Sequence, residues 1–161
     1  MKKIVIFGNS GAGKSTLANQ LHEDAGLSHL DLDTIAWQPS SPPTRKPIAE
    51  VSQEIAEFIH ETSCWVIEGC YADLLELVLH EATELIFLDL PIEQCVENAK
   101  NRPWEPHKYP SKAVQDENLP MLVEWIQQYE TRDDTFSREA HRALFDGFNG
   151  TKSRFTTMKE V

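Results

Sequence analysis

Eight residues near the start of the chain combine glycine, lysine and serine at the spacing of a phosphate-binding loop. The run Gly8-Asn9-Ser10-Gly11-Ala12-Gly13-Lys14-Ser15 fits the pattern G-x-x-x-x-G-K-[ST]. In such a loop the backbone N–H groups surround nucleotide phosphates, the lysine reaches the β- and γ-phosphates, and the hydroxyl binds Mg²⁺. We therefore expect residues 8 to 16, ending at Thr16, to bind ATP, with Lys14 catalytic and Ser15 on the metal. The alternative is a glycine-rich turn that binds nothing, which has little use for the lysine.

Two carboxylates at the end of an apolar run are the second candidate for chemistry. Asp31 and Asp33 lie near the carboxyl end of the strand predicted at residues 27–32. Residues two apart on a strand share one face, so both side chains are expected to reach one site. Asp31 would then orient Mg²⁺, and Asp33 would hold the substrate and take a proton from its hydroxyl. The alternative is a solvated acidic strand end.

Two further residues follow predicted strands directly. The carboxylate of Asp89 comes after the strand at 85–88 and is expected to contact the Mg²⁺ shell or the Ser15 hydroxyl. Its alternative role is to cap the next helix, because Asp shortly before Pro favours a helix start. Gly69 follows the strand at 64–67, where a glycine lets the backbone approach a bound substrate closely. An ordinary strand-to-helix turn explains Gly69 equally well.

Arginines stabilise the charge that develops on a transferred phosphoryl group, and they often arrive on a lid. Residues 103–137 contain several prolines and break the regular pattern, so we expect them to form that lid. Arg102 and Arg132 flank or belong to it and are the candidates for catalysis; Arg138 and Arg142 follow. Taken singly, each is a solvated surface arginine, whereas around a lid one or two of them are expected to act.

The elements that position these residues alternate along the chain, which predicts an α/β fold with a parallel sheet. We expect strands at residues 3–7, 27–32, 64–67, 85–88 and 155–158. Helices are expected at 14–24, 48–61, 71–80, 92–101, 119–129 and 140–145, with an irregular excursion at 38–47. No linker divides the chain, so residues 1–161 are expected to form one domain.

The composition of the chain limits the kinds of molecule that it is expected to bind. The chain has 15 Lys and Arg against 26 Asp and Glu, a net charge of −11, which makes nucleic-acid binding an unfavourable expectation. No apolar run approaches the roughly 20 residues of a membrane span, and no signal peptide is recognisable. Cys64, Cys70 and Cys95 form no C-x-x-C pair and look like free thiols in a reducing cytoplasm.

Taken together, these motifs resemble the small P-loop kinases of the adenylate and shikimate kinase group. The resemblance rests on the phosphate loop, Asp31-x-Asp33 with Trp37 and Pro39 after it, residues 65–69, and residues 88–91. It covers residues 2 to 102 and is closest to the branch called DNA topology modulation proteins. It implies a three-layer P-loop NTPase fold with about five parallel strands, helices on both faces and a small lid. It also implies Mg²⁺ on Ser15, the acidic pair at metal and substrate, and Arg102 as a lid arginine.

Departures from the group narrow the expected substrate. No arginine follows Gly69 and none lies in 48–61, where adenylate and shikimate kinases hold anionic substrates. Cys70 and Asn98 stand where the topology-modulation branch has asparagine and arginine. We expect an ATP- and Mg²⁺-dependent phosphotransferase that moves the γ-phosphate to a hydroxyl, or a phosphate, of a small molecule. The alternative is an ATP-binding regulator with little or no transfer, which the missing arginines favour.

Overall fold

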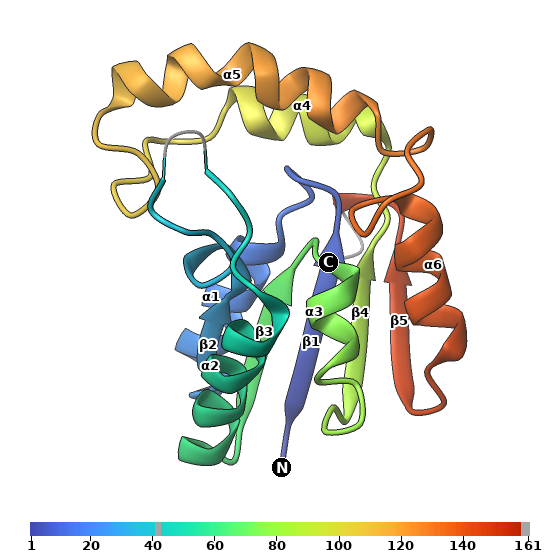
Figure 1. The fold of residues 1–161 in the computed structure, drawn as a ribbon. Coiled ribbons are helices and arrows are strands. Elements are labelled where there is room, and N and C mark those ends of the chain that lie inside the picture. The colour runs from blue at the N-terminus through green and yellow to red at the C-terminus, as the bar shows by residue number, and fades with distance from the viewer. Residues whose placement is uncertain (41–42, 159–161) are drawn as a thin grey trace.

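Five parallel strands form the centre of the molecule, with helices on both faces (Figure 1). The computed structural model describes residues 1–40 and 43–158. The strands are β1 (Lys3–Gly8), β2 (Ser28–Asp31), β3 (Trp65–Gly69), β4 (Glu84–Leu88) and β5 (Thr151–Phe155), in the spatial order β2-β3-β1-β4-β5. This arrangement confirms the predicted three-layer α/β fold with five parallel strands.

The central strands are apolar except for a charged residue at or near one end of each, because helices cover both faces of the sheet. Alternate residues of β1 enter two different cores. Val5 and Phe7 pack with α2 (Ile48–Glu61), α3 (Ala72–Glu76) and α6 (Arg138–Gly147). Ile4 and Ile6 pack on the other face with α1 (Lys14–Ala25), α4 (Ile92–Lys100) and α5 (Lys112–Gln127).

The carboxyl ends of the strands all meet at one edge of the sheet, where ligands of open α/β sheets bind. In Figure 1 this edge points upward, and α4 and α5 lie above it. The loop after β1, the turn η1 (Leu32–Thr34) after β2 and the residues that follow β3 and β4 all lie there. The fold therefore brings together segments that are far apart in the sequence.

The bounds of several predicted elements shift by one or two residues, and three elements differ more. The helix predicted at 71–80 ends at Glu76 as α3, and three-residue turns continue to Ala82, such as Val78 N–H to Leu75 O. The helix predicted at 119–129 begins seven residues earlier, because Ser111 caps α5 by accepting from the Val114 N–H. The last strand is β5 at Thr151–Phe155 instead of 155–158; it is a polar edge strand and lacks the apolar run that identifies central strands.

The predicted lid contains a long helix that is anchored to the rest of the molecule. The apolar side of α5 packs on α4 through Leu119, Leu122 and Ile126, and Pro120 lies inside this helix. At the end of the segment, the hydroxyl of buried Tyr129 donates to His141 Nδ1 at 2.7 Å, and His141 Nε2 donates to the Cys70 carbonyl at 2.8 Å. Burial lowers the pKa of His141 to about 4, so this imidazole is neutral. None of the helices in the described parts of the chain has the length and apolar character needed to cross a bilayer.

Candidate functional site

The loop between β1 and α1 has the conformation that phosphate binding requires. Helix α1 begins at Lys14 with no side-chain cap and no acidic residue in its first turn, so a bound anion could cap its first N–H groups. Gly11 and Gly13 have positive φ values of 79° and 90°. A Cβ on Gly11 would lie 2.3 Å from the Cys95 carbonyl oxygen, whereas one on Gly13 would meet no atom within 4 Å. The loop is thus closely packed from behind at Gly11 and open at Gly13.

Hydrogen bonds to neighbouring segments hold the loop in place. The Lys14 ammonium donates to the Asn9 carbonyl at 2.7 Å, and the Asn9 amide donates to the Ile126 carbonyl at the end of α5 at 3.2 Å. The Asn98 amide of α4 donates to the Gly11 carbonyl at 2.8 Å. Asn98 therefore supports the loop backbone at the position where the topology-modulation branch has an arginine.

The Ser15 hydroxyl points toward the end of β3. It donates to Glu68 Oε2 at 2.5 Å, and His29 Nε2 lies 3.1 Å from the same oxygen. The Glu68 side chain is only 2% exposed. Glu68 was missing from the predicted site residues, although it ends an apolar strand next to Gly69 and so carries the same sequence signal as Asp89.

Asp31 and Asp33 are brought together, but by a turn and not by strand alternation. Only Asp31 belongs to β2; Asp33 lies in η1, where Asp31 Oδ1 accepts from the Asp33 N–H at 2.9 Å. Burial and the charges of Glu68 and Asp33 raise the pKa of Asp31 to about 6. Burial also raises the pKa of Asp33, but Lys108 and Tyr71 lower it more, so it lies below its ordinary value. The two carboxylates thus differ in acidity: as the pH falls from neutral, Asp31 takes up a proton before Asp33 does.

Lys108 is the main residue of this site that the sequence did not reveal. Its ammonium lies 2.9 Å from Asp33 Oδ2, 3.7 Å from Asp31 Oδ2 and 3.6 Å from Glu105 Oε2. Burial lowers the pKa of Lys108, yet the charges of Asp33 and Asp31 raise it above its usual value. A lysine among three prolines has no spacing that links it to an acidic pair 75 residues away.

In the structure, the hydrogen-bond partner of the Ser15 hydroxyl is Glu68, and Asp89 pairs with two arginines. Its carboxylate accepts two hydrogen bonds from Arg138, at 2.9 and 2.8 Å, and one from Arg154 at 2.9 Å. It also does not cap α4, whose N-cap residue is Pro91. Burial raises the pKa of Asp89, but the hydrogen bonds from Arg138 and Arg154 lower it more, to below its ordinary value. Asp89 therefore joins β4 to α6 and β5, and Glu68 occupies the place beside Ser15.

Replacing Asp89 by asparagine is expected to lower the free energy of unfolding at pH 7 by about 1–3 kcal/mol, because two guanidinium groups lose their anion. A carboxyl group with a lowered pKa in the folded state stabilises above its unfolded pKa, and this contribution is lost as the pH falls through the folded pKa. The difference between the variant and the wild type should therefore shrink below about pH 4. Urea unfolding at several pH values measures it, with exposed Asp146→Asn on α6 as the control. Equal stability of Asp89→Asn and wild type at pH 7 would contradict this role.

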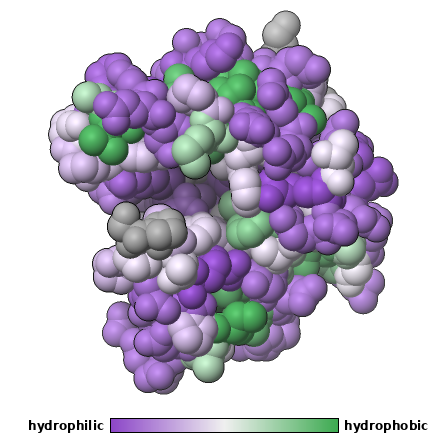
Figure 2. Space-filling model, turned by 45° about the horizontal axis from the view of Figure 1, so that its top comes forward, coloured by the Kyte–Doolittle hydropathy of each residue, from purple (hydrophilic) through white to green (hydrophobic). Residues whose placement is uncertain are grey.

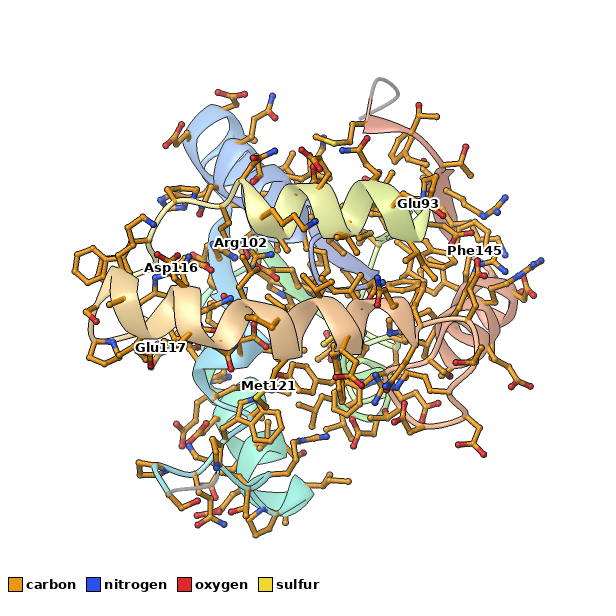
Figure 3. The ribbon with its side chains drawn as sticks, turned by 90° about the horizontal axis from the view of Figure 1, so that it is seen from above. Glu93, Arg102, Asp116, Glu117, Met121 and Phe145 are labelled. Atoms are coloured by element: carbon orange, nitrogen blue, oxygen red, sulfur yellow. The ribbon has the colours of Figure 1, made fainter. Side chains whose placement is uncertain are left out.

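The two candidate arginines are both paired with carboxylates. Arg102 lies between α4 and α5 (Figure 3) and contacts Glu105 at 3.2 Å. Arg132 contacts Asp134 at 2.9 Å, and its guanidinium stacks over the Trp125 ring at 3.4 Å from the ring centre. Arg102 is placed at the end of α4, next to the segment that supplies Lys108, whereas Arg132 lies beyond α5.

Gly69, at the end of β3, has a packing role. A Cβ on Gly69 would lie 3.0 Å from Leu32 side-chain atoms, so the glycine makes room for the turn that carries Asp33. All three cysteines are free. Burial raises the pKa of Cys70 to about 12 and that of Cys95 to about 11, so these two remain thiols.

The oxygen atoms around Ser15 are suitable ligands for a magnesium ion that keeps most of its water molecules. In the part of the chain that is described, no group of three or more His, Cys, Asp and Glu side chains could hold a metal by itself. Mg²⁺ bound with a nucleotide usually takes one or two protein oxygens, phosphate oxygens and several waters. The hydroxyl of Ser15 and the carboxylate of Glu68 offer such oxygens, and Asp31 is near enough to Glu68 for their charges to interact.

Comparison with solved structures supports the fold. A matching structure is an unliganded sugar kinase from Janibacter sp. HTCC2649, with a TM-score of 0.54 and 14% sequence identity; the alignment covers 97% of this chain and 85% of the kinase. At this identity the likeness shows the shared fold alone. Neither a family model nor a curated protein sequence matches the chain. The narrower resemblance to DNA topology modulation proteins gains no support from these comparisons.

Proposed function

We propose that this chain is an ATP- and Mg²⁺-dependent phosphotransferase that moves the γ-phosphate to a hydroxyl of a small molecule. The observation that carries the proposal is Asp33, a carboxylate kept ionised at the same edge of the sheet as the phosphate loop. The Lys14 charge contributes to its lowered pKa, so the two groups are close enough to interact. A glycine loop alone suggests nucleotide binding; an ionised carboxylate beside it adds a group for the acceptor.

Each part of the site has a role in this proposal. Residues 8 to 16 bind the phosphates, with Lys14 on the β- and γ-phosphates. Ser15 and Glu68, with Asp31 nearby, would hold Mg²⁺, which when bound neutralises charge on the phosphates. Asp33 orients the acceptor hydroxyl and takes its proton. Figure 2, which turns this end of the molecule toward the viewer, shows a hollow lined by hydrophilic residues, consistent with a polar acceptor.

The narrowed lid is part of the proposal. Because α5 packs along α4 and Tyr129 is buried, we limit the lid to residues 103–111 within the single domain. Arg102 is adjacent to this segment and is our first candidate for stabilising the transferred group. It would first have to leave Glu105, as Arg132 would have to leave Asp134.

An ATP-binding regulator with little transfer is the second candidate, and the paired state of both arginines favours it. The deciding experiment screens hydroxylated metabolites, sugars and nucleosides for stimulated ADP release, with calorimetry of ATP and Mg²⁺ binding on the same sample. ATP binding with acceptor-stimulated ADP release supports the kinase. ATP binding without stimulation by any of these compounds supports the regulator.

A further inference from the structure

The two carboxylate oxygens of Asp33 have partners of different kinds. Oδ1 accepts a hydrogen bond from the hydroxyl of Tyr71, and Oδ2 accepts one from the Lys108 ammonium at 2.9 Å. The Trp37 indole N–H donates to the Tyr71 oxygen at 2.8 Å. Because an indole can only donate, the Tyr71 hydroxyl must give its own hydrogen to Asp33. Tyr71 is only 2% exposed, so the donor of the bond to Oδ1 is held in the core, whereas the Asp33 side chain is 38% exposed.

Oδ2 is therefore the oxygen of Asp33 that an acceptor can use. A hydroxyl that enters the site must share or replace the bond from Lys108, because Tyr71 is fixed by its burial and by Trp37. The Lys108 ammonium has three donors and two other carboxylates close by, Asp31 at 3.7 Å and Glu105 at 3.6 Å. It can leave Oδ2 without losing every anionic partner.

The segment that carries Lys108 is otherwise tied to its own surroundings. Gln115 bonds both to the Glu105 N–H at 2.8 Å and to the Pro103 carbonyl at 3.1 Å, and Asn118 bonds to the Tyr109 hydroxyl at 2.8 Å. Within residues 1–40 and 43–158, the hydrogen bonds and ion pairs of 103–111 that reach beyond residues 102–118 all come from Lys108. This one side chain connects the segment to the acidic pair (Figure 1, the loop from α4 to α5).

We propose that Lys108 is a positioning residue that the segment 103–111 supplies to the acceptor site. It orients Asp33 through Oδ2 and holds the segment over the acidic pair until an acceptor hydroxyl takes its place at that oxygen. The contact between the segment and Asp33 does not depend on whether the protein is an enzyme. The replacement of Lys108 by an acceptor hydroxyl rests on the proposed function. Lys108 of the closed segment and the acceptor hydroxyl thus bind to the same atom, Asp33 Oδ2.

Hydrogen exchange of the full chain without nucleotide tests the contact. Lys108→Met is expected to speed the exchange of amides in 103–111 by about 5- to 10-fold, because a partly buried ion pair is lost. Asp33→Asn should have a similar effect from the other side, and Lys108→Arg should restore slow exchange. Lys112→Met is the matched control, since Lys112 is exposed on α5 and pairs only with Asp116 in the described chain. Exchange in Lys108→Met equal to wild type, or the same increase in Lys112→Met, would overturn the proposal.

A second readout separates a positioning role from direct action on the phosphate. ATP hydrolysis without an acceptor should rise several-fold in Lys108→Met, because water reaches the site when the segment opens. A fall in hydrolysis would instead place Lys108 on the transferred group and overturn its positioning role. If the wild type neither hydrolyses nor transfers phosphate, the proposed function fails, and the exchange experiment alone still decides whether Lys108 holds the segment.

Discussion

Replacing Asp33 by asparagine is expected to lower phosphoryl transfer by about 10²- to 10⁴-fold, the range typical of a lost general base. Asparagine keeps the size of the side chain but cannot take the acceptor's proton. Affinity for ATP should change little, because the proposed function assigns Asp33 to the acceptor and the phosphate loop is held by Asn9 and Asn98. Steady-state rates with the acceptor found in the screen, together with calorimetry of ATP binding, separate the two quantities.

The control for this experiment is Asp116→Asn, which makes the same chemical change on the exposed side of α5. Its transfer rate should equal that of the wild type. Equal turnover in Asp33→Asn and wild type would reject the role of Asp33 as a base. A large loss of ATP affinity in Asp33→Asn would instead show that the carboxylate supports the nucleotide site.

Lys14→Ala is expected to weaken binding of ATP with Mg²⁺ by about 10- to 100-fold, because hydrogen bonds to charged groups contribute about 1.5–3 kcal/mol. The loss applies whether the chain is a kinase or a regulator, so this variant tests the nucleotide site and not the class of protein. The loop should keep its shape, since the Asn9 carbonyl also accepts from the Ala12 N–H at 3.2 Å. Calorimetry measures the affinity, and thermal unfolding checks the fold.

Exposed Lys112→Ala is the matched control and should bind ATP as the wild type does. Unchanged affinity in Lys14→Ala would place the nucleotide elsewhere on the molecule. If the wild type itself shows no binding of any purine triphosphate with Mg²⁺, the interpretation of the glycine loop is wrong, and the function proposed from it falls with it.

The sequence predicted the parts of the fold that local patterns encode. The buried strands β1, β3 and β4 are continuous apolar runs, and the glycine loop has a fixed spacing, so both could be recognised without a structure. Edge strand β5 could not be placed correctly, because Thr151, Lys152 and Arg154 give it no apolar signal. Helix α5 was cut short because residues 112–118 are mostly polar and hide its start, whereas Pro120 fits the first turn of a helix that begins at 119.

In the candidate site, too, some features could be predicted from the sequence and others could not. Asp31 and Asp33 were found from their place after an apolar run, although the turn that joins them was not. Glu68 had the same strand-end signal as Asp89 and could have been proposed, but its contact with Ser15 and that of Lys108 with Asp33 join segments far apart, and no residue spacing encodes such contacts. Asp89 shows the converse, because a strand-end carboxylate looks the same in sequence whether its neighbour is a hydroxyl or two arginines.

The two parts of the proposed site differ in how freely their residues could be substituted during evolution or in the laboratory. On the nucleotide side, Gly11 fits against the Cys95 carbonyl and Asn9 is tethered to α5, so most substitutions there would disturb the backbone. On the acceptor side, a single lysine joins an outer loop to the rest of the site. Grafting a different sequence into 103–111 could therefore redirect the choice of acceptor while leaving the triphosphate cradle intact.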